Sequence, residues 1–492
     1  MNFQMFKLVL HQYVSEFNEN DNEYYNQDIK NERAESWLSE NIPQISIPDK
    51  DIERTYYFRW WVFRKHIKAT PDGYVITEFL PPVYWGGKHN TIIAAAGHHL
   101  SEAKWLRCGK KLIEDYSLLF LEEKTKTYLY SSWIIDAILE YCTHTGDFSF
   151  GVKHLDLMVS YYEKTECEHS TTSGLLWSVD NNDAMEFSIS GTNEELRAMR
   201  GVRPTLNSYM AANALAISKF AKLAGNDELA QKYRKKYDDL KSKINDILWD
   251  GEFYKAIHTE SLDSPSFDGL PDAQNAKELI GYIPWCFSLA PSGRESAFSY
   301  LKSTDCFKSE YGLTTAQKNH PRYLYEMGHE CLWNGYIWPF ATSQVLRAIE
   351  NLLNNYEQSV ITDHDFYDIL LAYAKSHRLT DKNGNEVCWI DEVKHPDTNE
   401  WSSRVLLESW GWREDKGGFE RGKDYNHSTF CDNVLSGLLG IRSDGSNITV
   451  NPRVPEDWKS FTVENLWVGD KCYSIFYEND GKEKRVSIKQ TN

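Results

Sequence analysis

The chain has 492 residues, of which 41% are hydrophobic and 26% are charged. This is the ordinary balance of a globular protein, and it excludes long disordered regions while leaving room for several domains or one large repetitive architecture. The formal net charge of −18 disfavours a nucleic-acid partner, because nucleic-acid binding relies on clustered Lys and Arg. Aromatic residues make up 14% of the chain, and their flat rings suit stacking on sugars as well as packing between helices.

The cysteines and the first residues of the chain indicate its compartment. Nine cysteines are scattered without a CxxC pair or a His at zinc-ligand spacing, which favours a reduced compartment. The amino-terminal residues lack a basic segment, a continuous apolar stretch and a cleavage site of small residues. No window reaches the roughly 18 uninterrupted apolar residues that a membrane-spanning helix needs. We therefore expect a cytoplasmic protein without a membrane partner.

Apolar residues recur three and four positions apart from about residue 53 to residue 440, which predicts amphipathic helices. The helices arrive in pairs, separated by long loops rich in Trp, Gly, Asn, Asp and His, and such loops are usually functional. The pattern fits a double ring of helices around a pocket, although an open solenoid would share the period. The predicted helical segments are residues 53–67, 94–120, 130–142, 152–164, 203–225, 227–249, 276–290, 293–303, 334–356 and 363–378.

After residue 440 the sequence alternates apolar and polar residues, which predicts a small antiparallel β cap with a hairpin turn at residues 479–481. We accordingly divide the chain into three parts. Residues 1–45 form an N-terminal extension that packs on the barrel, residues 46–442 form the barrel of helix pairs, and residues 443–492 form a small β domain.

The first candidate for chemistry is an acidic pair in WSVDNNDAMEFSISG, residues 177–191. Asp183 and Glu186 are three positions apart and would share a face of a helical turn. A proton donor for cleaving a glycosidic bond needs a raised pKa, and crowding carboxylates beside Trp and Met is one way to raise it. Helix capping or a solvated acidic loop would give the same spacing.

The second candidate is WIDEVKHPDTNEW, residues 389–401. Asp391, Glu392 and Glu400 are flanked there by aromatic residues and a Pro-Asp turn. A carboxylate in such a setting can activate water, although a solvated surface turn would look similar.

Two further segments carry polar and aromatic residues suited to a pocket. NGYIWPFATSQ, residues 334–344, reads as a helix start that forms part of the pocket wall. KDYNHSTF, residues 423–430, brings together Asp424, Asn426 and His427, which can hydrogen-bond sugar hydroxyls. Helix-cap chemistry would explain both segments equally well.

No metal or cofactor is expected. His98, His99 and Glu102 are neighbours on a predicted helix, but adjacent histidines point in different directions and the HExxH arrangement is missing. The sequence also contains no GxGxxG after a strand, no GxxxxGK[ST] and no GxSxG.

Taken together, these residues resemble the inverting glycosidases built on an (α/α)6 barrel, which include trehalases, the processing α-glucosidase of N-glycans and bacterial mannosylglycerate hydrolase. The resemblance spans about residues 50–445. In that family the general acid is an Asp in an S-G-[WLMR]-D-[ND]-like motif, and here DAMEFS stands in its place, with Glu186 at the acid position and Asp183 as the alternative. The family's general base is a Glu in a motif resembling E-x-Y-x-P-x-T-G. EVKHPDTN, which begins at Glu392, matches the Glu, the Pro and the Thr.

The sequence departs from the family after this motif. About 30 residues, through WGWREDKGGFERGKDYNHSTF, precede the helix comparable to the family's Phe-Ser-Trp-type helix, and Glu420 among them is a second candidate base. NGYIWPFATSQ resembles the family's WRGPIW-type segment, which lines the sugar site.

The resemblance implies a mainly α fold, an (α/α)6 toroid with a small C-terminal antiparallel β cap. It also implies an inverting glycoside hydrolase that cleaves an α-linked sugar without a cofactor. Small closed-ended pockets favour removal of a terminal residue, and the missing export signal suggests a small glycoside, so we expect exo-action. Glu186, or failing it Asp183, would protonate the leaving oxygen while Glu392 activates a water on the opposite face. Inversion predicts carboxyl groups roughly 6.5 to 9.5 Å apart. The candidate substrate-binding residues are Trp85, Trp177, Trp338 and Trp389 for stacking, and Arg203, Asn334, Asn426 and His427 for polar contacts.

Two alternatives belong to other classes. A sugar epimerase on the same toroid would need a pair of histidines in the pocket, for which His98, His329 and His427 are candidates. A non-catalytic carbohydrate-binding protein on a helical solenoid would leave the acids as ordinary surface groups. The sequence leaves the sugar and the oligomeric state open.

Overall fold

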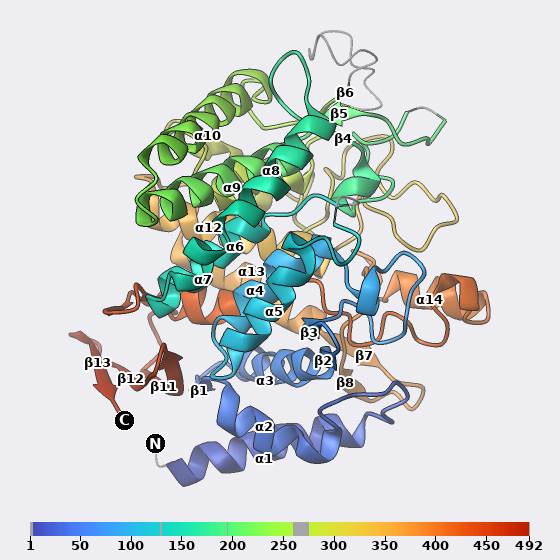
Figure 1. The fold of residues 1–492 in the computed structure, drawn as a ribbon. Helices are drawn as coiled ribbons and strands as arrows, with labels where there is room; N and C mark the ends of the chain where they lie inside the picture. The colour runs from blue at the N-terminus through green and yellow to red at the C-terminus, as the bar shows by residue number, and fades with distance from the viewer. Residues whose placement is uncertain (1–2, 128–129, 194, 259–274, 492) are drawn as a thin grey trace.

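The computed structural model describes residues 3–127, 130–193, 195–258 and 275–491. Helices make up the middle of the chain, and small sheets lie between them and at the chain ends (Figure 1). Along the sequence, outer and inner helices alternate, so that the inner helices form a ring that the outer helices cover. The predicted toroid of helix pairs with a C-terminal β cap is confirmed.

The inner ring consists of six helical segments within the described residues. Each segment packs against the next one in the chain, from α4 to the π-helix that precedes the β cap. The ring closes because the Glu102 carboxylate of α4 accepts hydrogen bonds from the backbone N–H groups of Phe430, at 2.5 Å, and Cys431, at 2.9 Å. The inner segments are α4 (Ala96–Ala103), α6 (Ile134–Thr145), α9 (Pro204–Leu223), α11 (Ile283–Cys286), α12 (Pro339–Asn355) and the π-helix (Asn433–Leu438).

The outer helices cover this ring, and the first of them packs against the last, α3 against α13. Two short helices, α7 (Ser149–Lys153) and α14 (Ser402–Ser409), lie in the connections. The outer segments are α3 (Lys50–Lys65), α5 (Gly109–Leu121), α8 (Leu155–His169), α10 (Asp227–Ile247), the 3₁₀ segment Glu295–Lys302 and α13 (Asp363–Ser376).

Several helices start at residues whose chemistry explains the boundary. The Asp49 and Asn226 side chains accept backbone N–H groups in the first turns of α3 and α10, and Thr362 forms a capping box in front of α13. Pro204 and Pro339 occupy the first positions of α9 and α12, where the missing N–H costs nothing.

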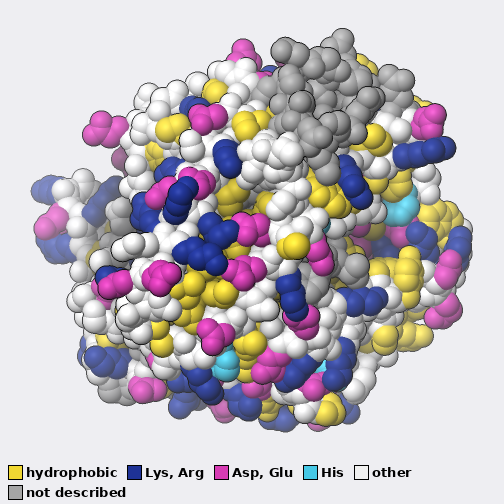
Figure 2. Space-filling model, turned by 45° about the horizontal axis from the view of Figure 1, so that its top comes forward, with side chains coloured by type: hydrophobic (Ala, Val, Ile, Leu, Met, Phe, Trp, Pro, Cys, Tyr) yellow, Lys and Arg dark blue, Asp and Glu magenta, His cyan; other side chains and the backbone are white. Residues whose placement is uncertain are grey.

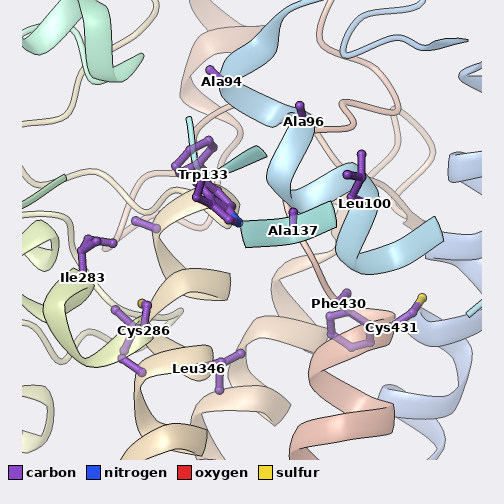
Figure 3. Packing of buried hydrophobic residues seen from close by; sticks show 14 of the residues in the cluster. Ala94, Ala96, Leu100, Trp133, Ala137, Ile283, Cys286, Leu346, Phe430 and Cys431 are labelled. Carbon is purple, nitrogen blue, oxygen red and sulfur yellow. The ribbon is translucent and has the colours of Figure 1, made fainter. Parts of the chain in front are cut away.

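The inner helices meet in an apolar interior that Figure 3 shows from close by. Trp133 lies in this interior, and Leu100 of α4 and Leu346 of α12 are fully buried there. α4 approaches the Trp133 ring so closely that a Cβ on Gly97 would lie 2.0 Å from it. A residue larger than glycine at position 97 would therefore push α4 away from α6.

Three small antiparallel sheets lead into the loops that carry acidic residues. β3 ends two residues before Glu78, a 3₁₀ turn after β4 leads to Glu186, and β8 ends four residues before Glu392. The sheets are β2–β3 (Ile67–Thr70 and Gly73–Ile76), β4–β5–β6 (Trp177–Ser178, Gly201–Val202 and Ile257–His258) and β7–β8 (Arg378–Thr380 and Glu386–Cys388).

The β cap is an antiparallel sheet that joins both ends of the chain, which lie on the same side of the molecule (Figure 1). β1 pairs with β11, with Gln44 opposite Glu464, and the division proposed at residues 45 and 46 falls inside β1. The hairpin predicted at residues 479–481 is confirmed, because β12 and β13 pair across it and Gly481 has a φ of +84°. The strands are β1 (Gln44–Ser46), β11 (Ser460–Val468), β12 (Lys471–Asn479) and β13 (Lys484–Gln490), with the separate hairpin β9 (Ile441–Ser443) and β10 (Ile448–Val450).

The N-terminal segment contains α1 (Phe3–Glu19) and α2 (Ala34–Asn41), and α1 packs against α3. The buried Asp21 carboxylate, which follows α1, lies 2.9 Å from both Lys65 Nζ and Lys423 Nζ. These ion pairs connect the N-terminal segment to α3 and to the loop that enters the π-helix.

The face shown in Figure 2 carries Lys and Arg interspersed with Asp and Glu, and no large basic patch is visible on it. Within the described ranges, the helices are all too short or too polar to cross a membrane.

Candidate active site

The amino ends of the inner helices surround a cavity of about 270 Å³. Its wall takes Ala94 from just before α4, Tyr130 from before α6, Trp338 from the start of α12 and His427 from before the π-helix. Loops between helix pairs complete the wall. The described residues that line the cavity are Glu78, Phe79, Tyr84, Trp85, Ile92, Ala94, Tyr130, Asn181, Ala184, Glu186, His329, Glu330, Cys331, Trp338, Phe340, Glu392, Lys416, Arg421, Tyr425 and His427.

Six of the residues singled out from the sequence line this cavity. They are Trp85, Glu186, His329, Trp338, Glu392 and His427. These residues come from separate loops and one helix start, so the fold brings together side chains that are more than 300 positions apart in the chain.

Glu186 lies on a tight loop after β4. The flanking residues Ala184 and Phe187 both have positive φ angles, +57° and +61°, and the Glu186 carbonyl accepts a hydrogen bond from the Trp333 N–H at 3.1 Å. No ion pair to Glu186 occurs among the described residues. Burial raises the pKa of Glu186 to about 8, with the negative charges of Asp180 and Glu392 adding to the rise. Glu186 is thus a carboxylic acid that holds its proton at neutral pH.

Asp183 does not line the cavity. Its carboxylate is fully buried and pairs with Arg203, whose Nε lies 2.6 Å from Oδ2. Ser131 donates to the other oxygen at 2.6 Å, and the Thr205 hydroxyl also donates to Oδ2. Both oxygens of the Asp183 carboxylate are therefore occupied and are not available to a ligand. The ion pair of Asp183 with Arg203 connects the loop of Glu186 to the start of α9.

Glu392 faces the cavity from the loop after β8. Its Oε2 accepts a hydrogen bond from the Arg421 guanidinium, and its Oε1 lies 3.9 Å from Cys331 Sγ. The backbone N–H of Glu392 donates to the Asp391 carboxylate at 2.8 Å, which fixes the direction of the chain here. Burial raises the pKa of Glu392 to about 7, although the positive charge of Arg421 opposes the rise.

Arg421 also belongs to a second ion pair at the cavity wall. It lies 3.4 Å from Glu330 Oε1, and Lys416 Nζ lies 2.9 Å from the same oxygen. Burial alone would raise the pKa of Glu330, but Arg421, His329 and Lys416 together lower it. Arg421 and Lys416 are the Arg and Lys side chains of the described wall, and each is therefore paired with a carboxylate. Both residues come from the stretch that departs from the family pattern.

Glu78 is a fourth carboxyl on the described cavity wall, and no motif in the sequence singled it out. The Tyr425 hydroxyl donates to Glu78 Oε1, and the other oxygen, Oε2, has no hydrogen-bond partner among the described residues. Burial raises the pKa of Glu78 to about 8, and the charges of Glu392 and Glu186 add to it. The Tyr425 ring stacks on His427, with ring centres 3.6 Å apart.

Two of the predicted stacking residues lie elsewhere. Trp177 packs under the guanidinium of Arg200 at 4.2 Å, and Trp389 lies between the cations of Arg404 and Lys423, at 4.7 and 5.2 Å. Neither indole belongs to the described residues that line the cavity.

The predicted polar residues Asn334 and Asn426 also stabilise loops and do not line the cavity. Asn334 Nδ2 donates to the Tyr325 carbonyl at 2.8 Å, and Asn426 Nδ2 donates to the Thr77 carbonyl at 3.3 Å. The alternative base Glu420 pairs with Arg404 and is likewise absent from the described lining.

The histidines of α4 have partners of their own. His99 contacts the Tyr116 hydroxyl at 2.9 Å and the Asn426 carbonyl at 2.6 Å, and Glu102 caps the π-helix as described above. His98 packs against the Trp133 and Phe340 rings. Their side chains thus position the loop of His427.

The sequence family whose model matches the chain is the mannosylglycerate hydrolase MGH1-like glycoside hydrolase domain, over residues 88–428. A solved structure described as a sialidase has a TM-score of 0.86 and 33% identity, and the match covers 98% of this chain and 43% of that one. The mannosylglycerate hydrolase from Thermus thermophilus, solved with glucose, has a TM-score of 0.51 and 12% identity over 73% of this chain and 100% of that chain. At that identity the likeness concerns the fold.

An uncharacterised protein of Borreliella burgdorferi is 21% identical over 336 residues, which are 66% of this chain and 65% of that protein. The chain therefore spans less than two thirds of the length of both this relative and the sialidase. The family match covers more than half of the chain and includes the loops of Glu186 and Glu392. The chain belongs to the mannosylglycerate hydrolase MGH1-like family of glycoside hydrolase domains.

Proposed function

We propose that the protein is an exo-acting, inverting glycosidase in which Glu186 is the general acid and Glu392 the general base. The observation that carries this proposal is the contrast between the two carboxyls on one cavity. Glu186 has no cationic partner among the described residues and a pKa of about 8, whereas Glu392 is paired with Arg421 and has a pKa of about 7. Near neutral pH one group can donate a proton while the other can accept one, which is the division of labour that glycoside hydrolysis needs.

In the proposed reaction, the sugar binds with its glycosidic oxygen beside Glu186. Glu186 gives its proton to that oxygen as the bond to the anomeric carbon breaks. Glu392 takes a proton from a water molecule on the opposite face, and the oxygen of this water forms the new bond to the anomeric carbon. The product sugar has the inverted configuration, and the proton moves from Glu392 back to Glu186 through solvent.

The size of the cavity supports exo-action on a small glycoside. About 270 Å³ is slightly below the usual range of about 300 to 1,000 Å³ for small-molecule pockets, which suits a single terminal sugar better than the middle of a polymer. An α-linkage, which the resemblance implies, is part of the proposal.

Asp183 is proposed as a structural residue, because its ion pair with Arg203 and its hydrogen bonds hold the carboxylate away from the cavity. The epimerase alternative has two histidines on the wall, His329 and His427, but family membership favours hydrolysis. We also propose a cytoplasmic location, which the nine free thiols support.

The test is hydrolysis of a panel of nitrophenyl and natural disaccharide glycosides, with the product anomers followed by NMR. We expect inverted product from the wild type, and a loss of about 10²- to 10⁴-fold in kcat for both Glu186→Gln and Glu392→Gln. Glu420→Gln and Glu140→Gln are matched controls that remove acids outside the cavity, and both should keep the wild-type rate.

Three outcomes would overturn the proposal. A retained anomer excludes the inverting mechanism. Full activity in Glu186→Gln or Glu392→Gln removes the assigned roles. Epimerisation of a free sugar without release of an aglycone would establish the alternative class.

A further inference from the structure

The cavity contains a group of three side chains that the acid and base roles leave unexplained: Glu78, Tyr425 and His427. Glu78 follows β3, and the other two precede the π-helix. The two segments are held together by the Asn426 N–H, which donates to the Glu78 carbonyl at 3.0 Å. This backbone contact fixes the three side chains relative to one another, without any ligand.

Polar atoms of this group lack partners. Glu78 is 6% exposed and His427 is 2% exposed, yet Glu78 Oε2 and both ring nitrogens of His427 have no hydrogen-bond partner among the described residues. Buried polar atoms in folded proteins are nearly always hydrogen-bonded. Because both residues line the cavity, a bound molecule is in a position to complete their hydrogen bonds.

The electrostatics of the wall indicate the kind of molecule. Arg421 and Lys416 are the Arg and Lys side chains of the described lining, and both are paired with Glu392 or Glu330. The positive charges of both described cations are therefore matched by carboxylates of the wall, and the Arg421 Nε–H is left without a hydrogen-bond partner among the described residues. A charged substituent on the ligand would have no unmatched cation to balance it. Glu78 itself carries a proton at neutral pH, since burial raises its pKa to about 8, so it presents a donor and an acceptor without a charge.

We propose that Glu78, held by Tyr425 and next to His427, binds hydroxyl groups of the sugar ring on which Glu186 and Glu392 act, and that this ring carries no anionic substituent. The inference rests on the proposed function and names its substrate class, a neutral sugar. The Glu78 carboxyl accepts a hydrogen bond from one hydroxyl and donates to the same or the adjacent one. His427, which burial keeps neutral by lowering its pKa, supplies another donor and acceptor pair.

Substitution of Glu78 tests the proposal. In Glu78→Gln the side chain keeps its size and retains both a donor and an acceptor, so kcat/KM with a neutral glycoside should fall less than about tenfold. In Glu78→Leu the size is similar but the polar atoms are lost, and kcat/KM should fall by about 100-fold. With the deoxy analogue that lacks the bound hydroxyl, kcat/KM of Glu78→Leu should be only a few-fold below that of the wild type, because the wild type then makes no hydrogen bond that the variant could lose.

The second arm compares sugars. A neutral pyranoside should be processed at least about 100-fold better than its uronic counterpart, in which a carboxylate replaces the CH₂OH group. Circular dichroism and thermal unfolding of each variant establish that it is folded before its kinetics are compared.

The proposal is overturned if Glu78→Gln is as inactive as Glu186→Gln, if Glu78→Leu matches the wild type, or if the uronic substrate is preferred. If the wild type hydrolyses no glycoside of the panel, the proposed function has failed. Binding of the neutral monosaccharides, measured by tryptophan fluorescence on the wild type and Glu78→Leu, then decides this inference separately. Equal affinity, or no affinity in either protein, contradicts it.

Discussion

The ring of inner helices carries acidic residues in two cavities, and the two cavities differ in how those acids are paired. The candidate active site lies at the amino ends of the helices. A second cavity of about 370 Å³ lies mostly toward their carboxyl ends, and its wall includes Asp136, Glu140 and Arg347. In the second cavity, Arg347 Nη2 lies 3.2 Å from Asp136 and also pairs with Glu140, while Lys104 lies 2.9 Å from Asp432.

The difference shows how the same residue types acquire different roles. Burial and the neighbouring Glu140 raise the pKa of Asp136, and the positive charge of Arg347 opposes this rise and favours the ionised carboxylate. Glu186 has no such partner among the described residues, and its pKa of about 8 makes it a proton donor. A buried acid with a fixed cation stabilises the structure, whereas a buried acid facing an open cavity without a cation is suited to proton transfer.

The largest expected effect is on the second cavity. Arg347→Met should lower the free energy of unfolding by about 3 kcal/mol, because it leaves the partly buried carboxylates of Asp136 and Glu140 without their ion-pair partner. Urea unfolding followed by tryptophan fluorescence measures the change. Under native conditions kcat/KM should stay within about twofold of the wild type, and a large loss of activity in the folded variant would show that the two cavities are coupled.

The next effect is on the candidate active site. Arg421→Met should reduce kcat/KM at pH 7 by about 100-fold, because removing a cation next to a carboxylate raises its pKa by about 1 to 3 units and leaves Glu392 protonated. The rising limb of the pH profile should move to higher pH, and activity should partly return there. A uniform loss with an unmoved limb would instead show that Arg421 acts through geometry alone.

The next smaller effect is the pH dependence of kcat/KM in the wild type. We expect a change of about tenfold per pH unit on each side of the optimum. The base Glu392 must be ionised, so kcat/KM rises with pH up to its pKa of about 7. The acid Glu186 must be protonated, so kcat/KM falls above its pKa of about 8. The profile should therefore peak between these values, measured with a substrate whose own groups do not titrate. A peak at the ordinary carboxyl pKa, about pH 4 to 5, would contradict the assigned raised values.

The smallest expected effect tests whether a cation must form an ion pair in order to stabilise the fold. Lys219 is an exposed residue at the rim of the second cavity, and no ion pair to it occurs among the described residues. Lys219→Met should change the free energy of unfolding by less than about 0.5 kcal/mol. Arg347→Met, measured in the same denaturation assay, is the comparison variant. If Lys219→Met changed the free energy of unfolding by more than about 1 kcal/mol, the Lys219 charge would interact more strongly with the cavity than its exposure suggests.

The helical period in the sequence predicted the ring because each amphipathic helix has one apolar face to bury, and the alternating residues after position 440 predicted the β cap for the same reason. The loops of Glu186 and Glu392 were selected by the family resemblance, and both residues line the cavity. Local spacing could not separate Asp183 from Glu186. Their difference depends on Arg203 and Thr205, which reach Asp183 from the start of α9.

The residues that sequence reasoning missed share a cause. Glu78 and Arg421 lie in loops without a motif, and their roles arise from contacts with Tyr425 and Glu392, which are far away in the chain. The sequence signal for Arg421 and Tyr425 was the stretch that departs from the family pattern and contains both residues. An insertion beside a site can replace part of the wall of that site. Conversely, Trp177 and Trp389 looked suited to sugar stacking, but cations beside them in the fold occupy their faces.

The pairing of β1 with β11 has a consequence for synthesis. Gln44 leaves the ribosome long before its partner Glu464, which lies more than 400 residues further along the chain, is made. Until then the hydrogen-bonding edge of β1 has no strand to cover it, and an uncovered edge is a place where nascent chains associate with one another. The strand β11 can therefore cover β1 only after the residues of the helical ring have been made, so damage to β11 should appear first as poor yield and aggregation.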